Sequence, residues 1–272
     1  ETHKRATGVV LVVGGSRLMT GAVCLVAAAA YRVGAGLVQV AVPGSILPVV
    51  QSLVREATFV PLPETPEGTV APEASEVLAE RLPAADALAL GPGMTTHEAT
   101  AAWIRATVAT SPVPVVLDAD GLNAFTDRAP ELAARRADLV LTPHAGEFAR
   151  IAGVGAREIA ADRLGHVRAL AAETKATVLL KGTRTLVATP EGHVRVNPTG
   201  GPYLATGGTG DVLTGAIAGL LARGLAPVDA ASVGAFVHGR AGALAAERTG
   251  EGTTAVDVLE HVAEALRGIR GA

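Results

Sequence analysis

Residues 205–213 read Ala-Thr-Gly-Gly-Thr-Gly-Asp-Val-Leu and lead into an apolar run, residues 212–223, that has the pattern of a helix. The glycines at 207, 208 and 210 allow the backbone to approach a ligand closely. The first turn of a helix has free N–H groups and the positive end of the helix dipole, and both attract anions. The stretch therefore predicts a phosphate site at a helix N-terminus.

Asp211 stands directly after the last of these glycines and has two interpretations. It is either a helix cap, worth about 1 kcal/mol, or a general base beside a bound phosphate. Local features leave both open. No lysine follows the glycines as in a Walker A loop, and no G-x-G-x-x-G follows an early strand, so the pattern disfavours standard P-loop and Rossmann sites.

Short apolar runs recur on both sides of the chain's midpoint, each followed by a helical pattern. The runs do not alternate polar and apolar residues, which is typical of parallel strands buried on both faces. They cover residues 8–13, 37–42, 87–90, 113–117, 138–141 and 177–180. Candidate helices such as 96–109 and 157–173 lie between them. This alternation predicts an α/β fold, a three-layer α/β/α sandwich around a mostly parallel sheet.

Residues 185–196 break that rhythm. Two short apolar segments, 186–188 and 194–196, flank a Pro-Glu-Gly turn and predict a small antiparallel hairpin. After the hairpin the chain is mostly helical, and neither a linker nor an internal repeat interrupts it. We therefore expect one domain over residues 1–272.

Composition restricts the kind of protein. The chain has 272 residues, of which 49% are hydrophobic, so a large core is available and a disordered chain is excluded. A net charge of −3 gives no electrostatic basis for binding nucleic acid or an anionic membrane. The single cysteine, Cys24, excludes a disulfide scaffold and cysteine-based zinc sites, and it suits the cytoplasm. Cys24 lies in an apolar helical pattern and is expected in the core.

Residues 33–54 form an uncharged stretch long enough to span a bilayer. Pro43 and Pro48 divide it, so a strand followed by a helix is the favoured interpretation. No secretory signal is visible in the sequence. The chain begins at Glu1 rather than at a methionine, and we expect the gene product to extend further upstream.

In open α/β sheets, ligands bind beyond the carboxyl ends of the strands. Three strand ends carry chemical groups: Asp118 and Asp120, His144, and Lys181. The two aspartates would point the same way if their strand continued. They could then act as an acid–base pair or as metal ligands. The alternative is that they cap the turn at Gly121. His144 is a ligand contact or a hydrogen-bonded loop residue, and Lys181 lines a nucleotide site or is a solvated strand end.

Several motifs in a fixed order resemble one family. The motif at 205–213 resembles the anion hole of the ribokinase-like superfamily. The string Thr-Pro-His-Ala-Gly-Glu at 142–147 and Asp-Ala-Asp-Gly-Leu at 118–122 are more specific, and they resemble the ADP/ATP-dependent NAD(P)H-hydrate dehydratases. Further strings agree: His3-Lys4 before residues 8–16, and residues 20–22, 32–37, 91–93, 181–182 and 197–201. The resemblance spans about residue 3 to about residue 245.

The resemblance implies a hydro-lyase that repairs nicotinamide cofactors. A nucleoside phosphate, by family habit ADP, drives removal of water from (6S)-NADHX or (6S)-NADPHX and yields NADH or NADPH, AMP and phosphate. It implies Asp211 as the catalytic base. It implies contacts to the hydrated cofactor from Ala22, Gly93, His144 and Asp211, and contacts to the nucleotide from Lys181, Gly182, Thr183, Arg184, Thr185, Gly208, Thr209 and Gly210.

The resemblance also implies Mg²⁺, with Glu147 as a ligand through water. The alternative for Glu147 is a first-turn carboxylate that complements the helix dipole. Family members are often tetramers, and some carry an epimerase domain upstream, so a homo-oligomer and such a domain are expected partners. The remaining histidines, His3, His97, His166, His193, His238 and His261, show no metal spacing and are interpreted as structural or surface residues.

Two other classes of function share these motifs. A small-molecule kinase of the same superfamily would have the same glycine–aspartate motif but would release a stable phosphorylated product. A nucleotide-binding regulator without catalysis would be expected to lose Asp211 or the glycines, and this chain has them all. The strings at 118–122 and 142–147 favour the dehydratase.

Overall fold

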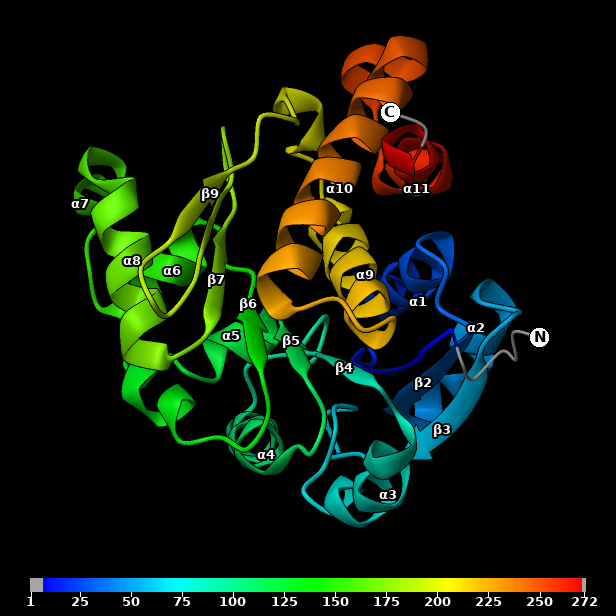
Figure 1. Ribbon diagram of the computed structural model, residues 1–272. Coiled ribbons are helices and arrows are strands. Elements are labelled where there is room, and N and C mark those ends of the chain that lie inside the picture. The colour runs from blue at the N-terminus through cyan, green and yellow to red at the C-terminus, as the bar shows by residue number, and fades with distance from the viewer. Residues whose placement is uncertain (1–6, 271–272) are drawn as a thin grey trace.

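The computed structural model describes residues 7–270, so the His3-Lys4 motif lies outside the described residues. Nine strands form one sheet in the order β3-β2-β1-β4-β5-β6-β7-β8-β9 (Figure 1). The strands are β1 (Val9–Val13), β2 (Leu37–Pro43), β3 (Thr58–Leu62), β4 (Ala87–Leu90), β5 (Val115–Leu117), β6 (Leu139–Leu141), β7 (Thr177–Leu180), β8 (Leu186–Ala188) and β9 (Val194–Val196). Neighbours from β3 to β7 pair parallel, and β8 and β9 pair antiparallel. The mostly parallel sheet and the hairpin are therefore confirmed.

Helices cover both faces of the sheet, as the three-layer prediction requires. Alternate residues of β1 point to opposite faces, so Val10 and Val12 lie in one core and Leu11 and Val13 in the other. The first face is covered by α1 (Gly21–Arg32), α2 (Leu47–Leu53), α9 (Thr209–Ala222), α10 (Pro227–Thr249) and α11 (Ala255–Arg270). The second is covered by α3 (Ala74–Arg81), α4 (Glu98–Thr110), α5 (Asp120–Asn123), α6 (Ala145–Ala152), α7 (Ala156–Ala161) and α8 (Arg163–Thr174).

Two local predictions were incomplete. The single helix expected at 157–173 is two helices, α7 and α8, because Asp162 leaves the helical conformation (φ −142°, ψ 71°) and its carboxylate accepts a hydrogen bond from Gly165 N. The strand β3 was missed. It is an edge strand that contains Pro61 and exposes alternate residues, so it lacks a continuous apolar run.

The uncharged stretch at 33–54 forms β2 and α2, joined by a short 3₁₀ turn, so the strand-and-helix interpretation is confirmed. Among residues 7–270, no helix combines the length and the apolar character needed to cross a membrane.

Helix α9 lies between α1 and α10 on the first face (Figure 1). Twelve of its fourteen residues are buried, and the two that are not, Gly210 and Asp211, belong to its first turn. The helix contacts the backbone of α1 at Gly215, where an added Cβ would collide with the carbonyl oxygen of Val26. The contact therefore requires glycine, and it fixes where the N-terminus of α9 stands.

We expect Gly215→Ala to lower the free energy of unfolding by about 2 kcal/mol or more, because the methyl group forces two packed helices apart. The matched control is Gly268→Ala on α11, where an added Cβ meets nothing within 4 Å and which is exposed. That control should gain about 0.5–1 kcal/mol from helix propensity. Urea unfolding monitored by circular dichroism measures both, and equal effects of the two substitutions would contradict the close contact.

Candidate functional site

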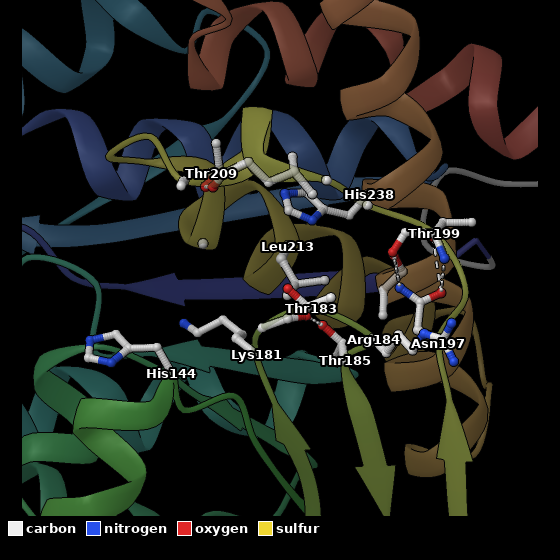
Figure 2. A pocket seen from close by; sticks show the side chains of 18 of the residues that line it. His144, Lys181, Thr183, Arg184, Thr185, Asn197, Thr199, Thr209, Leu213 and His238 are labelled. Carbon is white, nitrogen blue, oxygen red and sulfur yellow. Dashed lines mark hydrogen bonds between the residues drawn. The ribbon is translucent and has the colours of Figure 1, made fainter. Parts of the chain in front are cut away.

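A cavity of about 950 Å³ opens at the carboxyl ends of the strands. Four segments line it: the start of α6, the loop 181–185 after β7, the loop 197–206 after β9, and the first turn of α9. Helix α10 completes the lining with Ala235, His238 and Gly239. Figure 2 shows Thr209 and His238 along one side of the cavity, and His144, Lys181 and Thr183 along the other.

The glycine motif forms the start of α9 as predicted. Gly208 is the residue before the helix and has φ +90°, a left-handed conformation that a side chain would strain. The Thr209 hydroxyl donates to the carbonyls of Leu204 (2.7 Å) and Thr206 (2.9 Å) and so holds the loop in shape. No side-chain hydrogen bond caps the helix. No side chain therefore occupies its first-turn N–H groups, and because Thr209 and Gly210 of that turn line the cavity, the turn can bind an anion there.

Beneath this turn lies a cluster of one lysine and three carboxylates. Lys181 Nζ is 2.9 Å from Asp118 Oδ1 and 3.8 Å from Glu147 Oε2. The other Asp118 oxygen accepts from the Thr214 hydroxyl at 2.6 Å, which joins α9 to the end of β5. A Cβ at Gly210 would lie 3.4 Å from Lys181 Nζ, so the ammonium group lies directly under the glycine loop. Lys181 is therefore an ion-paired residue of the cavity and not a solvated strand end.

The cluster shifts the pKa of two of its members. Burial, reinforced by the negative charge of Asp118, raises the pKa of Asp211 to about 7, although Lys181 opposes the shift. Burial alone would lower the pKa of Lys181, but Asp118, Glu147 and Asp211 together raise it. Asp211 therefore titrates close to neutral pH, where a general base is most effective, while Lys181 stays charged.

His144 and Glu147 form the N-terminal cap of α6. His144 Nδ1 accepts from the backbone N–H groups of Gly146 (2.9 Å) and Glu147 (3.2 Å), and Glu147 Oε2 accepts from His144 N (2.8 Å). Because Nδ1 is an acceptor, the imidazole proton sits on Nε2. The hydrogen-bonded loop interpretation is therefore confirmed, and because His144 also lines the cavity with a side chain that is 55% exposed, a ligand contact stays a prediction.

Ala22 and Gly93 lie together but outside the lining of this cavity. A Cβ at Gly93 would be 3.5 Å from the Cβ of Ala22 and would touch Met19. Ala22 belongs to α1, and the same helix touches the glycine loop, because a Cβ at Gly208 would lie 2.8 Å from Leu25 Cδ1. The pair thus stands on the α1 side of the loop, away from residues 181–185.

Asp118 and Asp120 do not act as a pair. The strand ends at Leu117, and Ala119 has φ +51° and ψ −122°, which turns the chain sharply into α5. Asp118 faces Lys181 and Thr214, whereas Asp120 accepts from the backbone N–H of Thr95 at 2.8 Å. The continued strand that would align them does not occur.

His238 lies in the wall of the cavity. It is 8% exposed and lines the cavity from α10, which is compatible with the structural role expected from the sequence. Its place in an apolar helical pattern is typical of a core position and did not point to the cavity. Cys24 is buried as expected, and burial raises the pKa of its thiol to about 11.

A magnesium ion fits this site only together with a phosphate ligand. Within residues 7–270, no group of three or more His, Cys, Asp or Glu side chains is arranged to hold a metal ion. Magnesium keeps several waters and commonly binds through one or two carboxylates plus substrate phosphates. Glu147, 6% exposed beside the cavity, can supply such a carboxylate through water.

Comparisons with known proteins agree with this geometry. A family model described as NAD(P)H-hydrate dehydratase matches residues 10–264. An ADP-dependent (S)-NAD(P)H-hydrate dehydratase of Xanthomonas campestris is 38% identical over 248 residues, which cover 91% of this chain and 83% of that protein. A bifunctional NAD(P)H-hydrate repair enzyme of Moorella thermoacetica is 45% identical over 98% of this chain and 51% of that protein. The chain spans about half the length of such bifunctional relatives.

A solved structure gives the same result. The ADP/ATP-dependent NAD(P)H-hydrate dehydratase of Bacillus subtilis, co-crystallised with ATP and Mg²⁺, superposes with a TM-score of 0.81 and 30% identity over 98% of this chain and 92% of that one. A ribokinase-like protein of Enterococcus faecalis, with a TM-score of 0.83 at 23% identity, shares the fold. The family resemblance and the ribokinase-like fold inferred from the motifs are confirmed.

The raised pKa of Asp211 has a consequence for stability. Between the unfolded pKa near 3.8 and the folded pKa of about 7, the native state binds a proton that the unfolded state has lost, so stability falls as pH rises through this window. Asp211→Asn removes that penalty. We expect its melting temperature to exceed that of the unchanged protein, by a margin that grows from pH 5 to pH 8 and reaches at least about 2 °C.

The control is Asp257→Asn on α11. Hydrogen bonds from Thr254 lower the pKa of Asp257, so its carboxylate stabilises the fold at neutral pH and the variant should melt lower at pH 8. Differential scanning calorimetry measures both variants. A melting temperature for Asp211→Asn that falls below that of the unchanged protein at pH 8 would show that the carboxylate is not buried at an electrostatic cost.

Proposed function

The chain belongs to the NAD(P)H-hydrate dehydratase family, and we propose that it uses ADP or ATP to remove water from (6S)-NADHX and (6S)-NADPHX, which restores NADH and NADPH. The observation that carries the proposal is a carboxylate with a pKa of about 7, Asp211, in the anion-binding first turn of α9. A plain helix cap would not need such a carboxylate, since Gly208 already stands at the capping position.

The chemistry explains why a kinase-like site serves a lyase. The hydroxyl of the hydrated ring is a poor leaving group. Its oxygen attacks the terminal phosphorus of the nucleotide. The bond between that phosphorus and the bridging oxygen breaks, and AMP is the leaving group when ADP is the phosphoryl donor. The phosphorylated ring then loses phosphate together with a proton from the neighbouring carbon, and the dihydropyridine ring is regenerated. A stable phosphorylated product would instead indicate the kinase.

The residues in and beside the cavity have matching roles. Asp211 takes the proton of the hydroxyl as its oxygen attacks. The N–H groups at Gly208, Thr209 and Gly210 stabilise the charge on the transferring phosphoryl group. Lys181, which lies under the glycine loop and is kept charged by its carboxylate neighbours, adds a fixed positive charge.

The nucleotide and the hydrated cofactor approach Asp211 from opposite sides. Residues 181–185 line the cavity beside the glycine loop, which supports their role as nucleotide contacts, namely Lys181, Gly182, Thr183, Arg184 and Thr185. Ala22 and Gly93 lie on the α1 side of the loop, which supports their role as contacts to the hydrated ring. His144 lines the cavity beside Lys181 and would contact the ring from that side. The phosphoryl group would then pass across the first turn of α9.

Magnesium would be held by the nucleotide phosphates and, through water, by Glu147. When bound, the ion neutralises charge between the phosphates. The cation fits beside the cluster because Asp118 and Glu147 together carry more negative charge than Lys181 compensates.

The wider setting is also inferred. One nine-stranded sheet, formed by strands between residues 9 and 196 and covered by the helices that follow, supports the single domain expected over residues 1–272. Relatives in which this chain matches about half of a bifunctional enzyme support an epimerase domain upstream in the full gene product. We also propose a homo-oligomer, and a cytoplasmic location that a lone, buried and unpaired cysteine suits.

The test combines the protein with (6S)-NADPHX, Mg²⁺ and either ADP or ATP, and follows the recovery of reduced-nicotinamide absorbance. We expect recovery that requires nucleotide, with one phosphate released per NADPH formed. Asp211→Asn should still bind nucleotide in calorimetry and lose about 10²–10⁴-fold in kcat, the usual contribution of a general base. In the unchanged protein, kcat/KM should rise with pH through about 7, since only the carboxylate form of Asp211 accepts a proton.

Asp138→Asn is the matched control, because Asp138 is exposed and stands just before β6, at the amino ends of the parallel strands, whereas the cavity lies at their carboxyl ends. Nucleotide binding without recovery of absorbance in the unchanged protein would reject the dehydratase in favour of the kinase. Full turnover in Asp211→Asn would reject the base assignment.

A further inference from the structure

Thr214 makes a hydrogen bond unlike those of other helical threonines in this chain. It lies inside α9, is 0% exposed, and donates its hydroxyl to Asp118 Oδ2 at 2.6 Å. A threonine within a helix commonly donates to the carbonyl oxygen four residues earlier. Three threonines of this chain do so: Thr110 to Ala106, Thr174 to Leu170 and Thr249 to Ala245. Thr214 instead bonds a carboxylate 96 residues away in the sequence, just beyond the end of β5.

This bond closes a ring of contacts at the start of α9. Asp118 Oδ1 accepts from Lys181 Nζ at 2.9 Å. A Cβ at Gly210 would lie 3.4 Å from that Nζ and 3.8 Å from Asp118 Oδ2. Residues four apart lie on one face of a helix, so Gly210 and Thr214 face the ion pair from the same side of α9. The glycine leaves room for the ammonium group, and the threonine holds the carboxylate.

The two bonds to Asp118 fix one carboxylate oxygen each. Asp118 is 2% exposed, so water can hardly replace a lost partner. Without the Thr214 hydroxyl, Oδ2 would lose a partner in a buried place, which costs free energy. Rotation of the carboxylate would relieve that cost by bringing both oxygens toward Lys181. Since the lysine stem is flexible, its ammonium group would follow the carboxylate away from Gly210.

The place of this ammonium group determines how strongly it acts on an anion in the cavity. Lys181 and Gly210 both line the cavity, and Gly210 belongs to the first turn of α9. The energy between two charges falls as the distance between them grows. An ammonium group held against that turn therefore attracts an anion bound there, even without touching it. Displacement of the group from Gly210 weakens the attraction.

We propose that Thr214 is a positioning residue of this site: through Asp118 it holds the ammonium group of Lys181 beneath the first turn of α9, where the charge strengthens the binding of a phosphoryl group. The inference rests on the proposed function for the presence of a nucleotide phosphate at that turn. It adds a buried residue that would act on the phosphate only through two others.

The test is a double-mutant cycle between Thr214 and Lys181, measured as the dissociation constant of inorganic pyrophosphate by calorimetry with Mg²⁺. Thr214→Val removes the hydroxyl and keeps the branched shape of the side chain. We expect it to weaken pyrophosphate binding about fivefold. Thr214→Ser keeps the hydroxyl and should bind within about twofold of the unchanged protein.

Lys181→Met completes the cycle and should by itself weaken pyrophosphate binding about tenfold or more, because it removes a charged partner of the anion. Adding Thr214→Val to Lys181→Met should then change the affinity by less than about twofold, since no ammonium group remains to be displaced. A threonine that only supports the helix would instead cause the same loss in both backgrounds.

Thr100→Val is the matched control. Thr100 is also 0% exposed within a helix, α4, and donates to the carbonyl of Val70 at 2.8 Å, but α4 covers the other face of the sheet. Both valine variants should lose stability in urea unfolding, and only Thr214→Val should lose pyrophosphate affinity. This comparison, with Thr214→Ser, stands even if Lys181→Met does not fold. Thr214→Ala replaces Thr214→Val if the valine variant does not fold.

Unaltered pyrophosphate affinity in a folded Thr214→Val, or an equal loss with and without Lys181, would overturn the proposal. Failure of the unchanged protein to bind pyrophosphate would also contradict it, since no anion site would then stand at that turn. These outcomes are independent of the hydrated cofactor, because calorimetry needs no turnover. Failure of the dehydratase assay with the expected cycle would reject the proposed reaction and leave the positioning role of Thr214 in place.

Discussion

Helix α9 reaches its place over the sheet only because Gly215 and Gly219 carry no side chain where the helix crosses α1. An apolar helix buried on all sides cannot slide or tilt without opening cavities in two interfaces. The only unburied residues of this helix, Gly210 and Asp211, therefore stand at a fixed height above the strand ends. The position of the anion site and of the carboxylate beside it follows from this packing.

The charges around Asp211 then set its pKa. Asp118, Glu147 and Asp211 share a single lysine, so the three carboxylates are not all neutralised. Asp118 is held by Lys181 on one oxygen and by Thr214 on the other, and its proximity raises the pKa of Asp211. Asp211 therefore holds its proton up to about pH 7. The burial of Asp211 beside Asp118 lowers stability at pH values above the unfolded pKa near 3.8, and it also produces a base that operates at neutral pH.

The sequence predicted the sheet, the hairpin and the anion loop, because each depends on local patterns of apolar residues, turns and glycines. It did not predict β3, whose exposed residues and Pro61 are tolerated only at an edge. It also could not separate Asp118 from Asp120, since their divergence depends on the left-handed backbone of Ala119. The place of His238 in the cavity wall depends on the packing of α10 against the distant loop at 197–206, which no local pattern encodes.

The central claim is that the hydroxyl of the hydrated ring is phosphorylated before it leaves. It can be tested by placing ¹⁸O in that hydroxyl of (6S)-NADPHX, supplying ADP and Mg²⁺, and analysing the phosphate by mass spectrometry. We expect the label in inorganic phosphate, because the oxygen binds phosphorus first and its bond to carbon breaks second. Label in water, with unlabelled phosphate, would contradict the claim, since the hydroxyl would then have left without ever joining the phosphoryl group.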